Sequence, residues 1–315
     1  MKTKKILFCV LNWGLGHATR STPLISSLLD EGHDVHIASD GIALDVLSDA
    51  FPSITVHRLP AYNVRYAKHR FFGLKLMQQT VQIYKAIAEE HKLVKQLVEQ
   101  YGFDEIISDN RLGCRTTSCP STVISHQLTI KGGLAGTLAT QVHRFFIRKF
   151  NALWIPDDES INLSGELTRW DNNPLPTRWL GVLSRIAKPH KREDVIYEAA
   201  IILSGPEPQR SILETQLLRL LTPKYDSIVL VQGNPNKPID APAHVKVIPL
   251  ASAEEIGFIL SRSKRLYCRS GYSTIMDIHG FDLEVTLIPT PGQTEQEYLA
   301  RYHEKKSGYR YMKQR

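Results

Sequence analysis

The residues with the clearest chemical potential lie between Asn12 and Arg20, which read N-W-G-L-G-H-A-T-R directly after the apolar run I-L-F-C-V-L. A glycine-rich turn between a buried strand and a helix lets backbone N–H groups approach an anion or a polar ligand. His17 stands at the start of the predicted helix, where a neutral imidazole accepts a proton near pH 7. We therefore expect Gly14 and Gly16 to shape a binding turn and His17 to act as a general base, with helix capping as its structural alternative.

A second strand, glycine turn and helix are predicted at C-R-S-G-Y-S-T-I-M-D, Cys268 to Asp277. Its N–H groups, hydroxyls and carboxylate suit a nucleoside diphosphate. The following segment T-P-G-Q-T-E-Q-E-Y, Thr290 to Tyr298, places amides and carboxylates at the next helix start, where they would pair with sugar hydroxyls. Each stretch taken alone also fits ordinary helix capping.

Hydrophobic periodicity predicts the elements that position the first motif. A buried-type strand at 5–11, an amphipathic helix at 18–30 and a strand at 34–38 form one βαβ unit. The same alternation continues with strands at 54–59, 105–108 and 122–125 and helices at 74–101 and 134–153. Strands that alternate with helices in this way predict a parallel, doubly wound sheet.

A second βα series follows a stretch at 172–192 that is rich in proline and basic residues, so we place an interdomain linker near 184–194. The second series comprises strands at 199–204, 227–232, 245–248, 265–268 and 285–289 and helices at 211–221, 253–261 and 274–280. The predicted fold class is α/β, with two Rossmann-like doubly wound domains, 1–184 and 185–315, facing across a cleft.

Composition favours a cytoplasmic, two-domain protein. The chain has 315 residues, of which 42% are hydrophobic, enough for two cores at about 100–200 residues per domain. No apolar run approaches the roughly 18 residues of a membrane span, and the start lacks a secretion signal. The four cysteines are scattered and form no C-x-x-C pair, which fits a reducing compartment.

The charge is basic, with a net charge of +7 and a pI near 9.1. Nucleic acid, an anionic membrane and phosphorylated small molecules are the partners that such a charge suits. The basic residues are scattered, without an RNA-recognition or helix-turn-helix pattern, which disfavours nucleic acid. Peripheral membrane contact or a solvated face would account equally well for the basic residues of the first half: Arg65, Lys68, Arg70, Lys75, Arg144, Arg148 and Lys149.

Two other ligand classes are less well supported. The dinucleotide fingerprint G-x-G-x-x-G requires a glycine where Thr19 stands, although Asp40 ends the second strand where a ribose-binding acid would lie. No D-x-D metal motif is convincing, and P-D-D-E-S at 156–160 has the composition of a turn. We expect no metal and no cofactor.

In this order and spacing, the motifs resemble those of the GT-B glycosyltransferases, most closely the MurG-like enzymes of family 28. The resemblance covers most of both halves. It implies inverting, metal-independent transfer of a hexose or N-acetylhexosamine from a UDP-sugar to a hydroxyl of a saccharide or lipid-linked acceptor, in polysaccharide or cell-envelope biosynthesis. It also implies that 1–184 binds the acceptor and 185–315 binds the donor.

The resemblance assigns roles to individual residues. G-L-G-H makes His17 the base, Arg185 lies near the donor pyrophosphate, and Asp277 stands where a glutamate accepts both ribose hydroxyls. S-G-P-E-P-Q-R at 204–210 occupies the phosphate-side loop, with proline and glutamate in place of its serine and glutamine. The predicted donor-binding residues are Arg185, Gly205, Arg269, Ser270, Gly271, Ser273, Thr274, Asp277, Gln293, Gln296 and Glu297. The predicted acceptor-binding residues are Gly14, Gly16, Asp109, Asn110 and His126.

Glu297 replaces a glutamine of the pair that reads the donor sugar, so an amide contact becomes an acceptor-only carboxylate. Two further functions share the same fold and remain open. A sugar-nucleotide epimerase or hydrolase would use the same donor contacts with additional acid and base groups. A non-catalytic sugar-nucleotide-binding protein would use His17 structurally and give no product.

Overall fold

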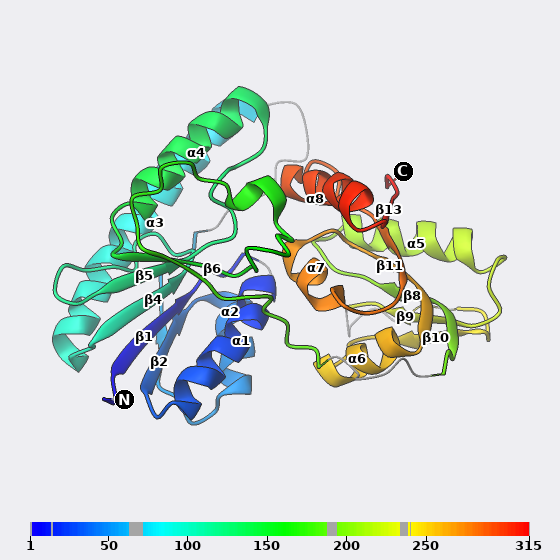
Figure 1. Ribbon diagram of the computed structural model, residues 1–315, viewed down its shortest axis with the longest axis horizontal. Coiled ribbons are helices and arrows are strands. Elements are labelled where there is room, and N and C mark those ends of the chain that lie inside the picture. The colour runs from blue at the N-terminus through cyan, green and yellow to red at the C-terminus, as the bar shows by residue number, and fades with distance from the viewer. Residues whose placement is uncertain are drawn as a thin grey trace. The chain divides into compact units, whose positions relative to one another are not determined.

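The computed structural model describes residues 2–13, 15–62, 72–187, 194–233, 239 and 241–314, except for the side chains of 72–81. The chain forms two compact units. The first comprises 1–130, 134–161 and 166–183, and the second comprises 131–133, 162–165 and 184–315. Each unit is built on a parallel sheet with helices on both faces (Figure 1).

The sheet of the first unit has the strand order β3-β2-β1-β4-β5-β6-β7. Its strands are β1 (Lys5–Val10), β2 (Asp34–Ser39), β3 (Val56–Arg58), β4 (Glu105–Asp109), β5 (Ser121–Ile124), β6 (Ala152–Ile155) and β7 (Thr177–Trp179). Each neighbouring pair is parallel. The strand order reverses direction between β1 and β4, and ligands of doubly wound sheets bind at the carboxyl edge of this switch point.

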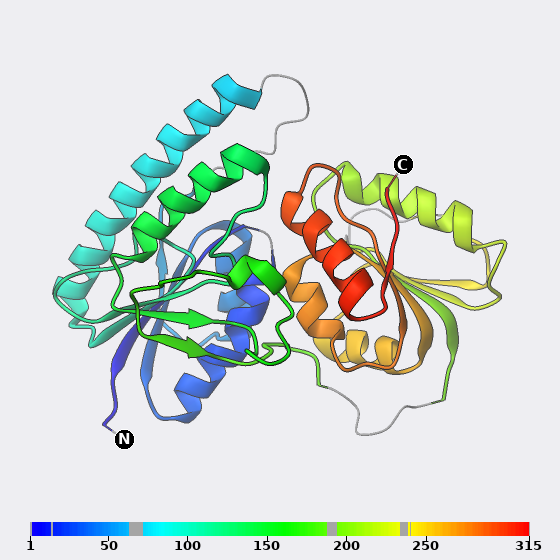
Figure 2. The same cartoon turned by 45° about the horizontal axis from the view of Figure 1, so that its top comes forward.

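Helices cover both faces of this sheet because both faces are apolar. They are α1 (Leu15–Asp30), α2 (Gly41–Ala50), α3 (Phe72–Tyr101) and α4 (Gly133–Ile147), followed by the 3-10 helix η1 (Gly165–Thr168). Successive strand side chains point to opposite faces, so Ile6 and Phe8 pack with α1 and α2 whereas Leu7 and Cys9 pack with α3. Figure 2 shows α3 and α4 together on one side of the sheet, where Tyr84 contacts Phe146.

The second unit repeats the arrangement with the strand order β10-β9-β8-β11-β12-β13. Its strands are β8 (Tyr197–Ile202), β9 (Ile228–Val231), β10 (Val245–Ile248), β11 (Ser263–Cys268), β12 (Glu284–Leu287) and β13 (Arg310–Tyr311). Its helices are α5 (Gln209–Leu221), α6 (Ala253–Ser261), α7 (Tyr272–Ile278) and α8 (Thr294–Lys306). One face packs on α5 and the other on α6, α7 and α8, and the switch point lies between β8 and β11.

The predicted fold class of two doubly wound parallel sheets is confirmed. The predicted helix at 134–153 is wrong in its last third, since α4 ends at Ile147. Lys149 and Phe150 instead donate backbone bonds to residues three positions earlier, which closes a tight turn before β6. The helix α2 was not predicted.

Candidate active site

His17 and Asp109 meet at the carboxyl edge of the first sheet, beside the switch point. Asp109 is the last residue of β4, and His17 lies in the first turn of α1, which follows β1. The two strands are hydrogen-bonded neighbours, and the Leu11 N–H donates to the Asp109 carbonyl at 3.1 Å. His17 Nδ1 lies 3.1 Å from Asp109 Oδ2.

Asp109 is a buried carboxylate, with 1% of its surface exposed. Arg20 Nε donates to Oδ2 at 3.0 Å, and Arg20 Nη2 donates to Oδ1 in a second close contact. The Ser21 hydroxyl also donates to Oδ2, at 3.1 Å. A bidentate guanidinium and a hydroxyl together compensate the loss of water from this charge.

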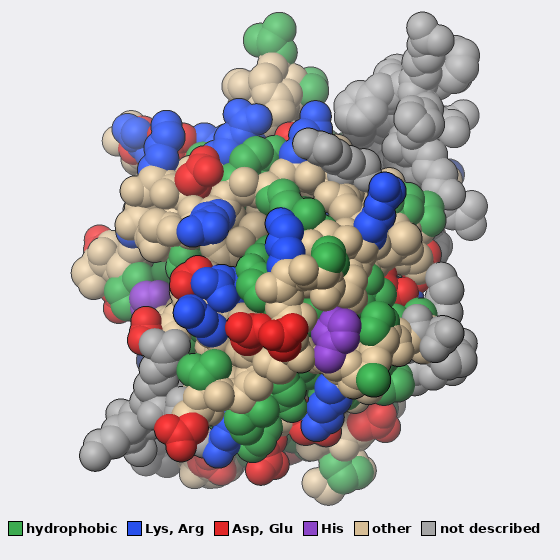
Figure 3. All heavy atoms as spheres, turned by 90° about the vertical axis from the view of Figure 1, so that its right-hand side faces the viewer, with side chains coloured by type: hydrophobic (Ala, Val, Ile, Leu, Met, Phe, Trp, Pro, Cys, Tyr) green, Lys and Arg blue, Asp and Glu red, His purple; other side chains and the backbone are tan. Residues whose placement is uncertain are grey.

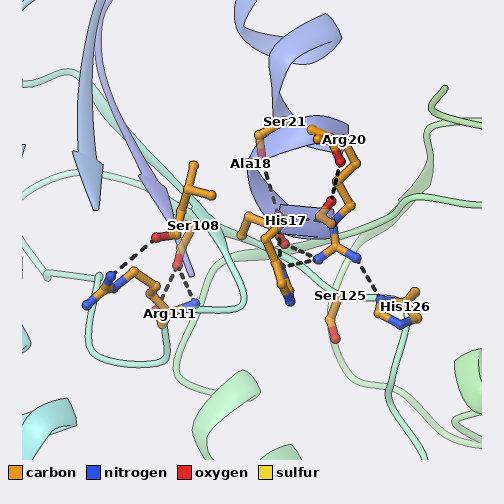
Figure 4. A network of polar contacts seen from close by, with 12 residues as sticks. His17, Ala18, Arg20, Ser21, Ser108, Arg111, Ser125 and His126 are labelled. Atoms are coloured by element: carbon orange, nitrogen blue, oxygen red, sulfur yellow. Dashed lines mark hydrogen bonds and ion pairs between the residues drawn. The ribbon is translucent and has the colours of Figure 1, made fainter. Parts of the chain in front are cut away.

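The guanidinium of Arg20 also reaches two imidazoles. Its Nη2 lies 2.7 Å from His17 Nδ1, and its Nη1 lies 2.8 Å from Nδ1 of His126, which follows β5. Arg20 follows His17 by three residues, so the two side chains lie on one face of α1. Figure 4 shows the Arg20 side chain with its contacts to His17 on one side and His126 on the other.

The pKa values of His17 and Asp109 are both lowered. Burial lowers the pKa of His17, and the positive charge of Arg20 adds to this, while Asp109 opposes both. Burial by itself would raise the pKa of Asp109, but Arg20 and then His17 outweigh it and hold that pKa well below its usual range. At neutral pH the site therefore contains a neutral His17 beside an ionised Asp109.

The other predicted acceptor residues differ in their surroundings. Gly14 lies outside the described residues, and the carbonyl of Gly16 accepts a bond from the Thr19 hydroxyl. Asn110 adopts a left-handed backbone, with φ 58°, and its buried Oδ1 has no hydrogen-bond partner among the described residues. The same holds for Nε2 of His143 on α4, whose pKa is lowered to about 4 by burial and by the neighbouring His126.

Asp40 has a structural role. Arg111 Nη1 donates to its Oδ1 at 2.6 Å, and Asn12 Nδ2 donates to its Oδ2 at 3.1 Å. Arg111 is itself fully buried and also donates to Glu90. Asp40, the acid that a nicotinamide site would require, therefore links the loops that follow β1, β2 and β4.

Arg269 occupies the corresponding place in the second unit, directly after β11 at the switch point. The side chain is 1% exposed, and its guanidinium donates to the carbonyls of Ile288, Pro289 and Gln209 and to Gln314 Oε1. All of these acceptors are uncharged. Burial lowers the pKa of Arg269 to about 10, so the side chain is still a cation at pH 7.

Gly205 lies above this cation. Its φ of +95° is a conformation that glycine adopts without strain, and a Cβ added there would lie 3.6 Å from Thr290 Oγ1 and 3.9 Å from Arg269 Nε. Both of these atoms are buried, and neither has a hydrogen-bond partner among the described residues. An exposed glycine turn thus covers a buried positive charge.

Asp277 has a partner from the segment that enters the second unit. The Ser184 hydroxyl donates to its Oδ1 at 2.7 Å, and the backbone of Arg185 donates to the same carboxylate. Burial raises the pKa of Asp277, and these bonds oppose the rise. The Arg185 side chain is exposed.

The remaining predicted donor residues surround the loop before α8. Gln296 Oε1 accepts from the Thr290 N–H, and Glu297 Oε1 accepts from the Gly292 N–H. The Ser270 hydroxyl donates to the Gln296 carbonyl, and Gln293 Oε1 accepts from Gln296 Nε2. Gly271 is the residue before α7, and Ser273 and Thr274 lie half-buried in its first turn.

Four polar residues of these sites were not predicted: Arg20, Ser21, Ser184 and Thr290. Arg20 was visible as the last residue of G-L-G-H-A-T-R, one helical turn after His17, which is a usable signal. The other three are hydroxyls within ordinary sequence, and only the folded chain brings them to their partners.

The acidic segment at 156–160 forms a turn, since Asp158 Oδ1 accepts the backbone N–H groups of Ser160 and Ile161. Among the residues that the structure describes, no group of three or more His, Cys, Asp and Glu side chains could hold a metal ion. Metal-independence stays a prediction.

Comparison with known proteins bears on the first unit and on the fold. Residues 4–120 match the family model described as glycosyl transferase family 1. An uncharacterised glycosyltransferase of Methanosarcina mazei is 22% identical over 93% of this chain and 81% of its own length.

Among solved structures, MurG of Acinetobacter baumannii is similar with a TM-score of 0.60, at 14% identity over 99% of this chain and 86% of that one. The Arabidopsis thaliana protein UGT89C1, solved with UDP-L-rhamnose, gives a TM-score of 0.66 at 12% identity over the same shares. These likenesses establish the fold and confirm the GT-B resemblance. Together, the family match and the fold define the class of protein, a glycosyltransferase enzyme with the GT-B fold.

Proposed function

We propose that the protein transfers a sugar from a nucleoside diphosphate sugar, with UDP as the first candidate nucleotide, to a hydroxyl of a saccharide or lipid-linked acceptor, with inversion. The observation that carries the donor half is Arg269, a buried cation whose hydrogen-bond partners among the described residues are all neutral. UGT89C1, a structure of the same fold, was solved with a UDP-sugar, which supports this class of donor.

The charge of Arg269 has a direct consequence. A buried charge is stabilised by an opposite charge or by strong hydrogen bonds, and the acceptors that the described part of the chain offers Arg269 carry no negative charge. A diphosphate seated on the exposed Gly205 turn would supply the missing anion. Since α7 has only seven residues, Arg269 is the stronger source of positive potential at this edge.

The chemistry of the first unit complements this donor site. In transfer, the acceptor hydroxyl loses its proton to His17 Nε2 while its oxygen forms a bond to the anomeric carbon. The bond from that carbon to the diphosphate breaks, and the diphosphate keeps the electron pair. Asp109 would accept the N–H of His17 Nδ1 and stabilise the imidazolium that forms, the role of the acid in a catalytic triad.

Calorimetric titration with UDP, TDP, GDP and ADP, with and without EDTA, tests the donor assignment. We expect UDP to bind without a metal, and Asp277→Ala to weaken binding by about 1–3 kcal/mol through loss of charged hydrogen bonds to the ribose. If no nucleoside diphosphate binds the folded wild type, the proposed function is wrong.

Ser184→Ala is the matched control for this variant, because it removes the partner of Asp277 without removing the carboxylate. If Asp277 binds ribose, only Asp277→Ala loses nucleotide affinity. Equal losses in the two variants would instead assign Asp277 to anchoring the segment at 184–185.

Product analysis separates the other functions on this fold. A transferase releases a nucleoside diphosphate only when an acceptor is present and forms a glycoside. An epimerase gives an altered nucleotide sugar, a hydrolase gives free sugar, and a binding protein gives no product.

The surface of α4 supports peripheral contact with the cytoplasmic face of an anionic membrane. Leu134, Leu138 and Phe145 are 92%, 63% and 55% exposed and fall within about 40° of one another around the helix. No Asp or Glu occurs at 127–156, and the exposed Arg148 and Lys149 end the stripe. Apolar side chains with flanking cations favour an anionic lipid surface.

Three observations limit this surface. The guanidinium of Arg144 donates to the carbonyls of Leu128 and Arg169 and is therefore held against the chain, while its membrane role stays a prediction. Arg65, Lys68, Arg70 and the side chain of Lys75 lie outside the described residues. None of the described helices combines the length and apolar character required to cross a membrane. Figure 3 shows a different face, the right-hand side of Figure 1, where basic side chains stand among acidic and apolar ones.

Co-sedimentation with vesicles tests the membrane contact. We expect binding to vesicles that contain phosphatidylglycerol, weaker binding to pure phosphatidylcholine, and at least a several-fold loss in Leu138→Asp. Ile42→Asp on α2, where Ile42 is 64% exposed, is the matched control and should bind as the wild type does. Equal binding by the two variants would exclude α4 as the contact.

A further inference from the structure

The side chain of Arg20 has contacts that the proposed function does not by itself require. Its guanidinium contacts three side chains. Nε lies 3.0 Å from Asp109 Oδ2, Nη2 lies 2.7 Å from His17 Nδ1, and Nη1 lies 2.8 Å from His126 Nδ1. The guanidinium of an arginine is a donor only and stays charged over the pH range in which histidine and aspartate titrate. Arg20 therefore places one permanent positive charge in contact with the carboxylate of Asp109 and the imidazoles of His17 and His126.

Without the charge of Arg20, His17 and Asp109 would have different protonation states. A buried carboxylate 3.1 Å from an imidazole favours the ion pair of imidazolium and carboxylate, because each charge then has its partner. An imidazolium cannot accept a proton from a hydroxyl. With Arg20 present, Asp109 already has its cation, and a second cation on His17 would face a guanidinium nitrogen at 2.7 Å.

We infer that Arg20 is a positioning residue that keeps His17 unprotonated beside the buried Asp109 carboxylate, and thereby available as a base at neutral pH. The charged and titratable groups that face His17 are Arg20 on α1, Asp109 at the end of β4 and His126 after β5. Arg20 and His126 disfavour its protonation, and Asp109 favours it. The inference rests on the proposed function only for its catalytic consequence, since the protonation of His17 is measurable in the absence of substrate.

The geometry of Nδ1 is consistent with this role. Nδ1 has a donor in Arg20 and an acceptor in Asp109, so each neutral tautomer of His17 has a partner. When Nδ1 accepts from Arg20 Nη2, the proton of the neutral ring is on Nε2. In the other tautomer the Nδ1 N–H donates to Asp109, Nε2 keeps a lone pair for the acceptor hydroxyl, and Arg20 Nη2 keeps only its bond to Asp109 Oδ1. Arg20 Nη1 also lies 2.8 Å from Nδ1 of His126.

Titration of the His17 ring by NMR, with ¹⁵N-labelled histidine, tests the inference directly. We expect the midpoint in Arg20→Met to rise by at least about one pH unit relative to wild type, because one pKa unit is a modest change for a buried charge pair. Arg20→Lys keeps the cation and should titrate close to wild type. An unchanged midpoint in a folded Arg20→Met protein would overturn the inference.

A double variant separates charge from packing. Arg20→Met combined with Asp109→Asn removes both charges, so the His17 midpoint should fall back to or below that of the wild type. This variant also guards against misfolding, since it leaves no unpaired buried charge. If the midpoint stays high in the double variant, a cause other than the Asp109 charge is responsible and the inference fails.

Activity then gives an independent readout. The acid limb of kcat/KM should move to higher pH in Arg20→Met, while UDP affinity, measured on the other unit, stays at the wild-type level. If His17→Ala leaves transfer unchanged, the proposed function fails, but the NMR titration still decides the role of Arg20. The two failures are thus distinguishable.

Discussion

His17→Ala is expected to lower kcat by about 10²–10⁴-fold, the usual contribution of a general base. His17 is the imidazole that has a buried carboxylate on Nδ1, and the pKa of that ring is lowered below its ordinary 6.5 by burial and Arg20. The wild-type kcat/KM should therefore hold its plateau below pH 6.5 and fall only when the ring becomes protonated at lower pH. Initial rates of glycoside formation over a pH series measure both effects.

Two controls make this result specific. Nucleoside diphosphate affinity should be unchanged in His17→Ala, because the proposed donor contacts lie in the second unit. His244→Ala, which removes an exposed imidazole that contacts the Thr222 carbonyl, should leave kcat unchanged. Full activity in His17→Ala would assign His17 a structural role through its contacts with Asp109 and Arg20.

The second large effect is expected at Arg269. Arg269→Met should weaken nucleoside diphosphate binding by about 2 kcal/mol, or about 30-fold, because the diphosphate loses the nearest buried cation. Arg269→Lys keeps the charge and should retain most of the affinity. Since the pKa of Arg269 is about 10, wild-type affinity should stay constant from pH 7 to 9 and decline as the pH approaches 10. Calorimetry at several pH values measures this profile.

The fold of these variants must be verified, because Arg269 also holds the carbonyls of Ile288, Pro289 and Gln209. Thermal unfolding identifies any variant that loses the native state. Thr290→Val is a milder test of the proposed diphosphate site, because it removes only a hydroxyl that has no partner among the described residues. A folded Arg269→Met protein with wild-type affinity would show that the diphosphate binds elsewhere.

The sequence predicted most of the helices and strands because hydrophobic runs and helix-capping residues are signals that lie within the element itself. The run I-L-F-C-V is buried on both faces, as the central strand of a parallel sheet is, and α6 has the predicted bounds because Ser252 and Glu255 form a capping box. The helix α4 was predicted too long because apolar residues beyond Ile147 pack in β6 instead. Periodicity does not distinguish a short buried strand from the continuation of a helix.

By itself, the sequence determined that the chain is α/β, that a glycine turn with His17 follows the first strand, and that a matching turn follows Cys268. The tertiary structure alone decided the partners of these motifs. Asp109 is 92 residues from His17 and reaches it because β1 and β4 are neighbours in the sheet. Asp40 is a structural acid and Arg269 a buried cation for the same reason. Their hydrogen-bond partners and their burial depend on which strand ends meet in the sheet, and the spacing of residues along the chain does not predict which ends meet.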